Sequence, residues 1–215
     1  MLEVWALEKE LLNKHGQKMG RKGLIMRKRI MEKALELISD SSYKDLTVAD
    51  VAYEAGTSTS TFYVYFSDIE DVLFACVQEA AEDIQDIMAV LEKQWTTENV
   101  VEMVSDFVDT YTATWEKHSA ELRVRNQEAD QGNIRFLQFR MDSTKDIIDG
   151  LNKKVMELQP QVANSRTLTM VLFTAMERLA GTNHRAISGR EKITRRKLNE
   201  AVKQFWVMLL IKGPC

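Results

Sequence analysis

The sequence has few of the residues that end helices or cross-link small domains. Its 215 residues include two prolines, nine glycines and two cysteines. With so few prolines and glycines, long segments rich in alanine, leucine, methionine, glutamate and lysine favour helix nearly throughout. Alternating apolar and polar runs bounded by turn residues are missing, so a sheet is not expected. These absences predict an all-α protein.

Two further absences bear on where the protein works. Its most hydrophobic stretch, residues 206–211, is far shorter than the roughly 20 residues that span a bilayer. Cys76 and Cys215 form no framework of paired spacings, which favours a reducing compartment. We therefore expect a cytoplasmic protein with no membrane partner.

The sequence also lacks a constellation typical of an enzyme. The three histidines are far apart and have no metal-ligand spacing. A nucleophile elbow, a phosphate-binding loop and a Rossmann glycine pattern are all missing. We predict no enzyme activity, no cofactor and no metal site, and we interpret Cys76 as a small buried hydrophobe, with redox sensing as the alternative.

What the sequence does contain is an uneven distribution of charge. Residues 13–33 hold eight basic residues and one acid, whereas residues 67–130 hold sixteen acids and four bases. A solvated helix face would account for either run. A basic arm beside an acidic body also suits a protein that presents one end to a polyanion.

Helical spacing and capping residues predict about nine helices. Three short helices precede six mostly longer ones, and the fourth is expected to run from a Ser67–Glu70 capping box through Leu91. The remaining expected helices cover residues 27–39, 47–56, 58–65, 97–117, 119–129, 133–158, 162–182 and 192–211. The predicted parts are a basic arm (1–26), a three-helix domain (27–67) and a larger helical domain (68–215).

The segment from Ala52 to Ser58 has the form A-x-x-x-G-x-S of a helix-turn-helix. A small residue at Ala52 lets two helices cross closely, Gly56 turns the chain, and Ser58 caps the second helix. The second helix can then enter a major groove. A plain helical hairpin is the alternative interpretation of this segment alone.

The residues that follow add a more specific signal. The run T-F-Y-V-Y-F at residues 61–66 closely resembles the signature that closes the recognition helix of the tetracycline-repressor (TetR-type) family. Residues 29–77 resemble the DNA-binding domain of that family along nearly their whole length. The resemblance implies a bacterial, nucleoid-associated transcription regulator, a homodimer that binds a palindromic operator in double-stranded DNA.

The resemblance also implies roles for single residues. Base edges would face Thr59, Ser60, Thr61 and Val64, and phosphates would be contacted by Thr47, Tyr63 and Tyr65. Arg27 and Lys28 of the basic segment are expected to add phosphate or minor-groove contacts. Ile69 departs from the family pattern, because members usually carry lysine there. The recognition helix also lacks the arginine, lysine, asparagine and glutamine that give bidentate base contacts.

Aromatic and methionine side chains in the second domain suit an adaptable apolar pocket, although an ordinary core is the alternative. The expected lining residues are Met103, Phe107, Tyr111, Trp115, Asn126, Phe136, Phe139, Met170, Phe173 and Met176. The last two helices carry apolar residues for a dimer interface, among them Val171, Met176, Val202, Phe205, Trp206 and Leu209, and burial of this surface within the chain itself is the alternative.

The function that these features predict is a ligand-responsive transcription regulator, specifically a repressor that a small, largely apolar molecule releases from its operator. A helical enzyme or ligand carrier is the first alternative, and it lacks a catalytic constellation. A structural protein that binds partner helices is the second, and it gives no reason for a basic arm beside a capped helix-turn-helix.

Overall fold

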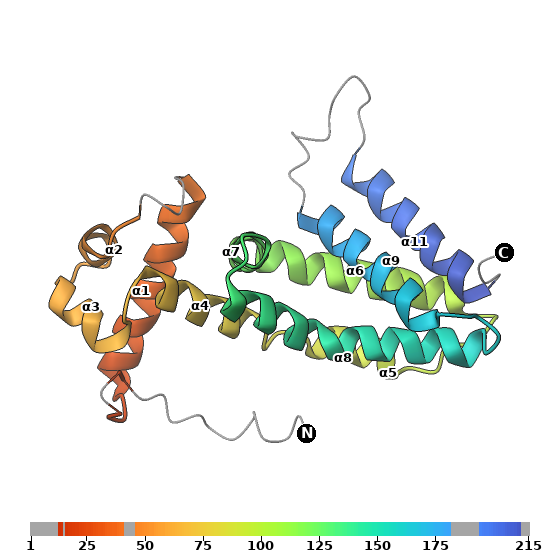
Figure 1. Ribbon diagram of the computed structural model, residues 1–215, viewed down its shortest axis with the longest axis horizontal. Helices are drawn as coiled ribbons and strands as arrows, with labels where there is room; N and C mark the ends of the chain where they lie inside the picture. The colour runs from red at the N-terminus through yellow and green to blue at the C-terminus, as the bar shows by residue number, and fades with distance from the viewer. Residues whose placement is uncertain (1–12, 15, 41–45, 182–193, 212–215) are drawn as a thin grey trace. The chain divides into compact units, whose positions relative to one another are not determined.

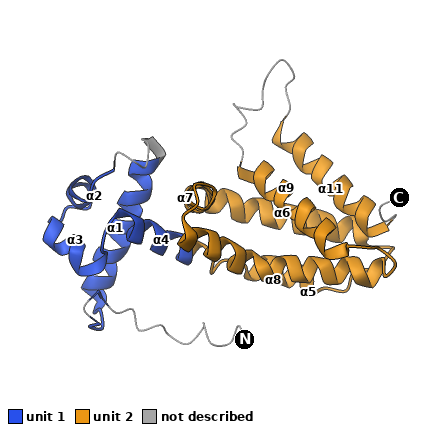
Figure 2. Ribbon diagram, in the orientation of Figure 1, with its two compact units in different colours: residues 1–79 blue, residues 80–215 orange. Residues whose placement is uncertain are grey.

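The computed structural model describes residues 13–14, 16–40, 46–181 and 194–211. The described residues are almost entirely helical, in ten helices (Figure 1). The all-α prediction is confirmed. The first twelve residues of the predicted arm and the predicted start of the last helix, at Lys192, lie outside the described residues. The chain divides into unit 1, residues 1–79, and unit 2, residues 80–215 (Figure 2).

Unit 1 consists of four helices: α1 (Arg21–Asp40), α2 (Val48–Glu54), α3 (Thr59–Tyr65) and α4 (Ile69–Ala80). Its core is formed by side chains at helical spacing that are fully or almost fully buried, including Ile30, Ala34, Val51, Phe62 and Leu73. Helix α1 begins at Arg21 rather than at Arg27, so residues 21–26 extend this helix instead of belonging to an arm. Unit 1 also includes α4, which the sequence analysis assigned to the second domain.

Unit 2 contains α5 (Gln85–Glu92), α6 (Val100–Lys117), α7 (Ser119–Asp130), α8 (Ile134–Leu158), α9 (Ser165–Gly181) and α11 (Arg195–Ile211). Helix α6 packs against α5, α9 and α11, and α8 packs against α5, α7 and α9. One apolar cluster between these helices contains both Trp115 and Trp206. The order and lengths of the helices from α6 to α9 follow the sequence prediction closely.

The prediction of one long fourth helix is wrong, because the structure divides this segment into α4 and α5, with a break at residues 81–84. No proline or glycine marks the break. Within unit 2, Asp83 Oδ2 instead accepts hydrogen bonds from Lys117 Nζ at 2.5 Å and pairs with His118 Nε2 at 2.9 Å. These two bonds hold the pKa of Asp83 below its usual value. A tertiary contact therefore fixes the break, which local helix propensity does not reveal.

The capping box expected at Ser67 and Glu70 is also wrong, by one residue. The Asp68 side chain accepts from the Asp71 backbone N–H at 2.8 Å, and the Asp71 carboxylate accepts from the Ser67 N–H at 3.1 Å. Aspartate is as good an N-cap as serine, so Asp68 caps α4. The second bond goes to the amide of Ser67 and not to that of the cap residue, so the pair is not a capping box.

Gly56 ends α2 with a positive φ of 66°, a conformation that costs other L-residues about 1–2 kcal/mol. A Cβ at this position would also lie 3.0 Å from a terminal nitrogen of Arg29. We expect Gly56→Ala to lower the free energy of unfolding by about 1–2 kcal/mol, measured by urea denaturation.

Gly20→Ala is the matched control. Gly20 has no positive φ, and an added Cβ would meet nothing within 4 Å. This substitution should leave stability unchanged or raise it slightly, because alanine has less conformational freedom in the unfolded chain. Equal effects of the two substitutions would contradict the assignment of strain to Gly56.

Candidate DNA-binding helix and ligand-binding core

The turn between α2 and α3 is built as the sequence predicts. Thr47 caps α2 through a reciprocal pair, because its Oγ1 accepts from the Asp50 N–H at 3.2 Å and Asp50 accepts from the Thr47 N–H at 3.1 Å. Ser58 caps α3 by accepting from the Thr61 N–H at 3.1 Å. Each cap therefore gives a hydrogen-bond acceptor to an amide group that has no partner within its own helix.

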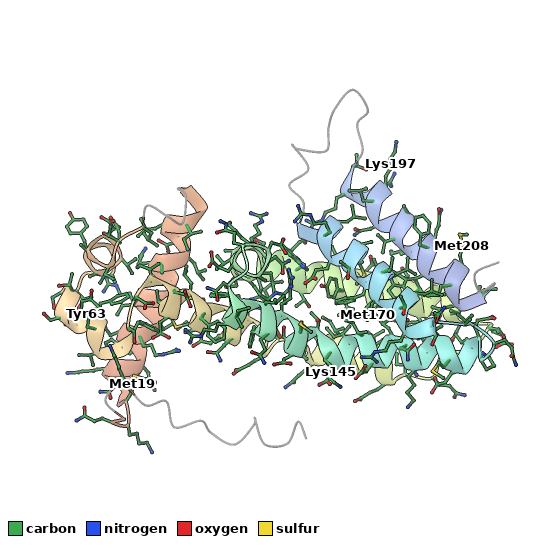
Figure 3. All side chains as sticks on the ribbon, in the orientation of Figure 1. Met19, Tyr63, Lys145, Met170, Lys197 and Met208 are labelled. Carbon is green, nitrogen blue, oxygen red and sulfur yellow. The ribbon has the colours of Figure 1, made fainter. Side chains whose placement is uncertain are left out.

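Helix α3 has one buried and one exposed side. Phe62 is fully buried and lies 5.8 Å from the buried Phe66, measured between ring centroids. On the other side, Thr59 and Ser60 are exposed and Tyr63 is 46% exposed (Figure 3). Hydroxyl groups therefore dominate the surface that a DNA groove would meet.

The structure changes the expected role of two predicted DNA contacts. The Thr61 hydroxyl is bonded to the Ser58 hydroxyl at 3.0 Å, so it belongs to the cap rather than standing free for a base edge. Arg27 lies over the Phe66 ring at 5.4 Å and pairs with Glu79 at 2.6 Å. The Arg27 side chain, 16% exposed, thus ties α1 to α4 within unit 1 instead of projecting toward phosphate.

The other predicted contacts stay near the surface of unit 1. Thr47 and Lys28 are exposed, and Val64 and Tyr65 are half-buried. The backbone N–H of Lys14, at the described end of the basic arm, donates to the Val64 carbonyl at 3.1 Å. This hydrogen bond brings the basic segment against the last turn of α3.

Six of the ten predicted ligand-binding residues gather in the apolar core of unit 2. All six are 1–7% exposed, and they are Met103, Phe107, Tyr111, Trp115, Phe173 and Met176. The Tyr111 ring meets that of Phe173 edge-on at 5.4 Å, and Phe107 meets Trp206 at 6.2 Å. The aromatic stripe on α6 therefore lies in the core, and α6 packs against α9 and α11.

The remaining four do not join this cluster. Phe136 is buried and Phe139 half-buried on α8, and Asn126 is half-buried on α7. The expectation for Met170 is wrong: it is 47% exposed at the edge of the buried stripe of α9, so it does not line the core (Figure 3).

The dimer surface expected on α9 and α11 also needs correction. Val202, Trp206, Leu209 and Leu210 are buried within their own chain, as is Met176. These side chains are therefore core residues of unit 2, as the alternative interpretation of the two helices predicts. Of the expected residues, Val171 and Phe205 are exposed, and Met170, Met208 and, at 39%, Ile211 are further exposed apolar side chains of α9 and α11.

A buried ion pair lies near the aromatic stripe, and only one of its members, Glu177, was identified from the sequence, as a candidate polar anchor of the pocket. Arg125 on α7, 4% exposed, pairs with Glu177 on α9, 9% exposed. The Arg125 Nε also donates to the Asn126 side chain at 3.1 Å. A signal was available, because each charge sits among apolar residues at helical spacing, Leu122 and Ala129 around Arg125 and Phe173 around Glu177.

The hydroxyl of Tyr111 is buried within range of the charges of Arg125 and Glu177. Burial raises the pKa of Tyr111 well above its usual value, and the Glu177 charge raises it further. The charge of Arg125 and the indole N–H of Trp115 act in the opposite direction. The Tyr111 hydroxyl therefore stays protonated at neutral pH and is available as a hydrogen-bond donor.

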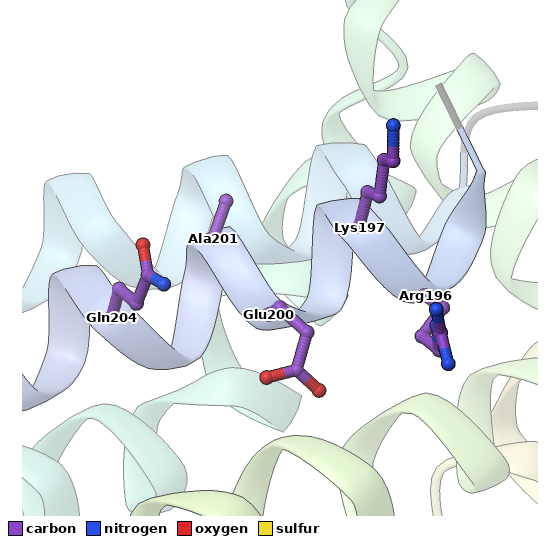
Figure 4. A pocket seen from close by; sticks show the side chains of 5 residues that line it. All are labelled: Arg196, Lys197, Glu200, Ala201 and Gln204. Atoms are coloured by element: carbon purple, nitrogen blue, oxygen red, sulfur yellow. The ribbon is translucent and has the colours of Figure 1, made fainter. Parts of the chain in front are cut away.

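The surface of unit 2 also has a hollow, but this hollow is a poor ligand site. Five residues of one helix, α11, line it: Arg196, Lys197, Glu200, Ala201 and Gln204 (Figure 4). A hollow with walls from a single helix cannot surround a ligand. In the described ranges, no group of three or more His, Cys, Asp or Glu side chains is placed to hold a metal, and no helix is long and apolar enough to cross a membrane.

Comparison with solved structures shows the same fold in bacterial regulators. The fatty acid degradation regulator FadR of Bacillus halodurans is 18% identical, with a TM-score of 0.65 over 89% of this chain and 97% of its own. FadR of Bacillus subtilis, solved in complex with stearoyl-CoA, is also 18% identical, with a TM-score of 0.64 over 87% and 99%. A TetR-like regulator of Rhodococcus sp. RHA1 is 15% identical, with a TM-score of 0.66 over 88% and 97%.

Among curated protein sequences, none matches the chain. Two family profiles do match. Residues 30–76 match the bacterial regulatory proteins of the tetR family, and residues 86–204 match the tetracyclin repressor-like C-terminal domain. The second match alone covers more than half of the sequence. The chain belongs to the TetR family of bacterial transcription regulators.

Proposed function

We propose that the protein is a repressor that binds a palindromic operator as a homodimer and is released from it by a small, largely apolar molecule. The observation that carries this proposal is the construction of α3. A glycine turn and a serine cap present a short helix whose buried side is anchored by Phe62 and whose other side exposes Thr59, Ser60 and Tyr63. This is the arrangement by which a recognition helix enters a major groove.

The charge of unit 1 supports DNA as the partner. Lys28 is exposed on α1, and the hydrogen bond from Lys14 to Val64 holds the basic segment beside α3. Basic side chains next to a recognition helix add affinity for phosphates that is independent of base sequence.

The exposed apolar residues of α9 and α11 support a homodimer. Val171 is 61%, Phe205 58% and Met208 55% exposed, although both helices already bury another face in their own unit (Figure 3). A second copy of the chain would cover these side chains in a two-fold symmetric four-helix arrangement.

The apolar core of unit 2 supports an apolar effector. The six predicted ligand-binding residues in this core are aromatic or methionine, and most of the other residues around them are aliphatic. The B. subtilis FadR structure holds stearoyl-CoA, which carries a long apolar chain. For a hundredfold loss of operator affinity, the effector must favour the released state by about 2.7 kcal/mol, and DNA must weaken effector binding equally.

DNA recognition is tested by selecting an operator from random duplexes and measuring the affinity of variants by fluorescence anisotropy at two salt concentrations. Ser60→Ala should change base preference by about 1–3 kcal/mol at one base pair, because Ser60 is exposed on α3. Lys28→Ala should weaken all sequences alike and reduce the salt slope by about one. A Ser60→Ala variant with unchanged preference, or a protein that enriches no duplex, would count against the proposal.

The dimer is tested at Phe205. Phe205→Glu should abolish dimerisation, because a glutamate buried unpaired at the interface costs about 3–5 kcal/mol. Sedimentation should then give the mass of one chain, and operator affinity should fall because a single copy reads one half-site. Val101→Glu is the control, since Val101 is similarly exposed, at 61%, but belongs to α6 and not to the two helices of the proposed interface. A Phe205→Glu variant that still sediments as a dimer would place the interface elsewhere.

A further inference from the structure

We infer that Arg29 and Lys14 bind DNA phosphates at the two ends of α3, and that they replace basic residues that the helix-turn-helix itself lacks. The inference rests on the proposed function for duplex DNA as the partner, and it names the side chains that neutralise the DNA backbone. Residues 47–66, which form the helix-turn-helix, contain no basic residue and two acids, Asp50 and Glu54.

A helix-turn-helix of this charge holds the DNA backbone poorly by itself. Much of the affinity of a protein for duplex DNA comes from basic side chains that neutralise phosphates. The exposed hydroxyls of α3 form hydrogen bonds, but they carry no charge. The cations that bind phosphate therefore have to come from other segments of unit 1 that lie close to α3.

Arg29 of α1 lies at the start of α3. Its guanidinium group is beside the turn between α2 and α3, because a Cβ on Gly56 would be 3.0 Å from Nη2, 3.5 Å from Cζ and 3.8 Å from Nη1. The missing side chain of Gly56 leaves this space to the guanidinium. Gly56 is two residues before Ser58, the N-cap of α3. The charge of Arg29 is thus next to the end of α3 that meets base edges in a helix-turn-helix.

Lys14 lies at the other end of α3. Its backbone N–H donates to the carbonyl of Val64, in the last turn of the helix, at 3.1 Å. The same end of α3 meets the start of α1, because the Tyr65 hydroxyl is 3.6 Å from the place that a Cβ on Gly23 would take. Since the backbone of Lys14 makes the bond to α3, its exposed side chain is not needed to hold the segment in place.

Both cations are available for a partner. Arg29 and Lys14 are exposed, and neither side chain forms an ion pair or a hydrogen bond with another residue of the described ranges. Arg27 differs, because Glu79 already neutralises it. The planar guanidinium of Arg29 therefore keeps its N–H donors for an external oxyanion, and it matches the geometry of phosphate.

The separation of the two cations fits the major groove. Helix α3 has seven residues, which extend about 10 Å along its axis. The major groove is about 12 Å wide, with a phosphate backbone along each side. A helix in this groove with one cation at each end brings the cations to different phosphates, one on each side of the groove.

The test measures binding of the full-length protein to a selected operator and to an unrelated duplex, by fluorescence anisotropy at several salt concentrations. Arg29→Gln and Lys14→Gln should each weaken binding to both duplexes about tenfold and reduce the slope of log K against log salt by about one, because each removes one phosphate contact. The double variant should lose about two, since contacts with separate phosphates are additive. Arg29→Lys should restore the slope but only part of the affinity, because lysine keeps the charge and lacks the planar fork.

Arg123→Gln is the matched control. It removes an exposed arginine of unit 2 that has no ion pair in the described part of the chain, and it should change binding to neither duplex. All variants should unfold at the urea concentration of the parent protein, because the substituted side chains are exposed. A lowered urea midpoint with an unchanged salt slope would make Arg29 a structural residue and overturn the inference. A double variant that loses only about one unit of slope would do the same for the two separate contacts.

The two duplexes separate this inference from the proposed function. If the operator binds and the single variants leave its salt slope unchanged, the inference alone is wrong. If selection enriches no operator, while the variants weaken binding to unrelated duplexes as expected, the phosphate contacts stand and the proposed function is wrong. If no duplex binds at all, both are wrong.

Discussion

The two helices that would meet DNA are each too short to exist alone. Helices α2 and α3 have seven residues each, and isolated helices shorter than about 12–15 residues are marginal in water. Their stability must come from packing and from their ends. Phe62 supplies the packing, since it is the buried residue of α3, and Thr47 and Ser58 satisfy amide groups at the two helix starts. The exposed face of α3 is thereby free to vary with the operator.

The core of unit 2 also contains charged side chains, whose burial costs free energy. A fully apolar core would be simpler to stabilise, because a buried ion pair rarely adds net stability over hydrophobic side chains of similar volume. Arg125 and Glu177 are nevertheless buried together near Tyr111, and the Trp115 indole N–H has no partner among the described residues. Departures of this kind from an apolar core are expected at functional sites rather than in a core that only stabilises the fold.

The parts of the structure that the sequence predicted well are those determined by neighbouring residues. The Thr47 and Ser58 caps, the Gly56 turn and the stripe from Met103 to Trp115 all follow from local spacing. The features that the sequence did not predict depend on contacts between residues far apart in the chain. The break at residues 81–84 depends on the hydrogen bonds of Asp83 with Lys117 and His118. The position of the Arg27 side chain depends on its ion pair with Glu79, fifty-two residues away. Which face of α11 is buried likewise depends on α6, so Leu209 and Phe205 could not be sorted by periodicity alone.

The break between α4 and α5 bears on how an effector acts. A continuous helix from unit 1 into the core would transmit a tilt as a rigid lever, but α4 ends at Ala80 and α5 begins at Gln85. A signal from unit 2 would instead have to pass through the segment that Asp83 anchors. His118 is the residue that begins α7 and also bonds Asp83. A displacement of α7 by an effector would therefore reach Asp83, and the residues that follow α4, through this contact. The break thus places the coupling at side-chain hydrogen bonds rather than along the axis of one rigid helix.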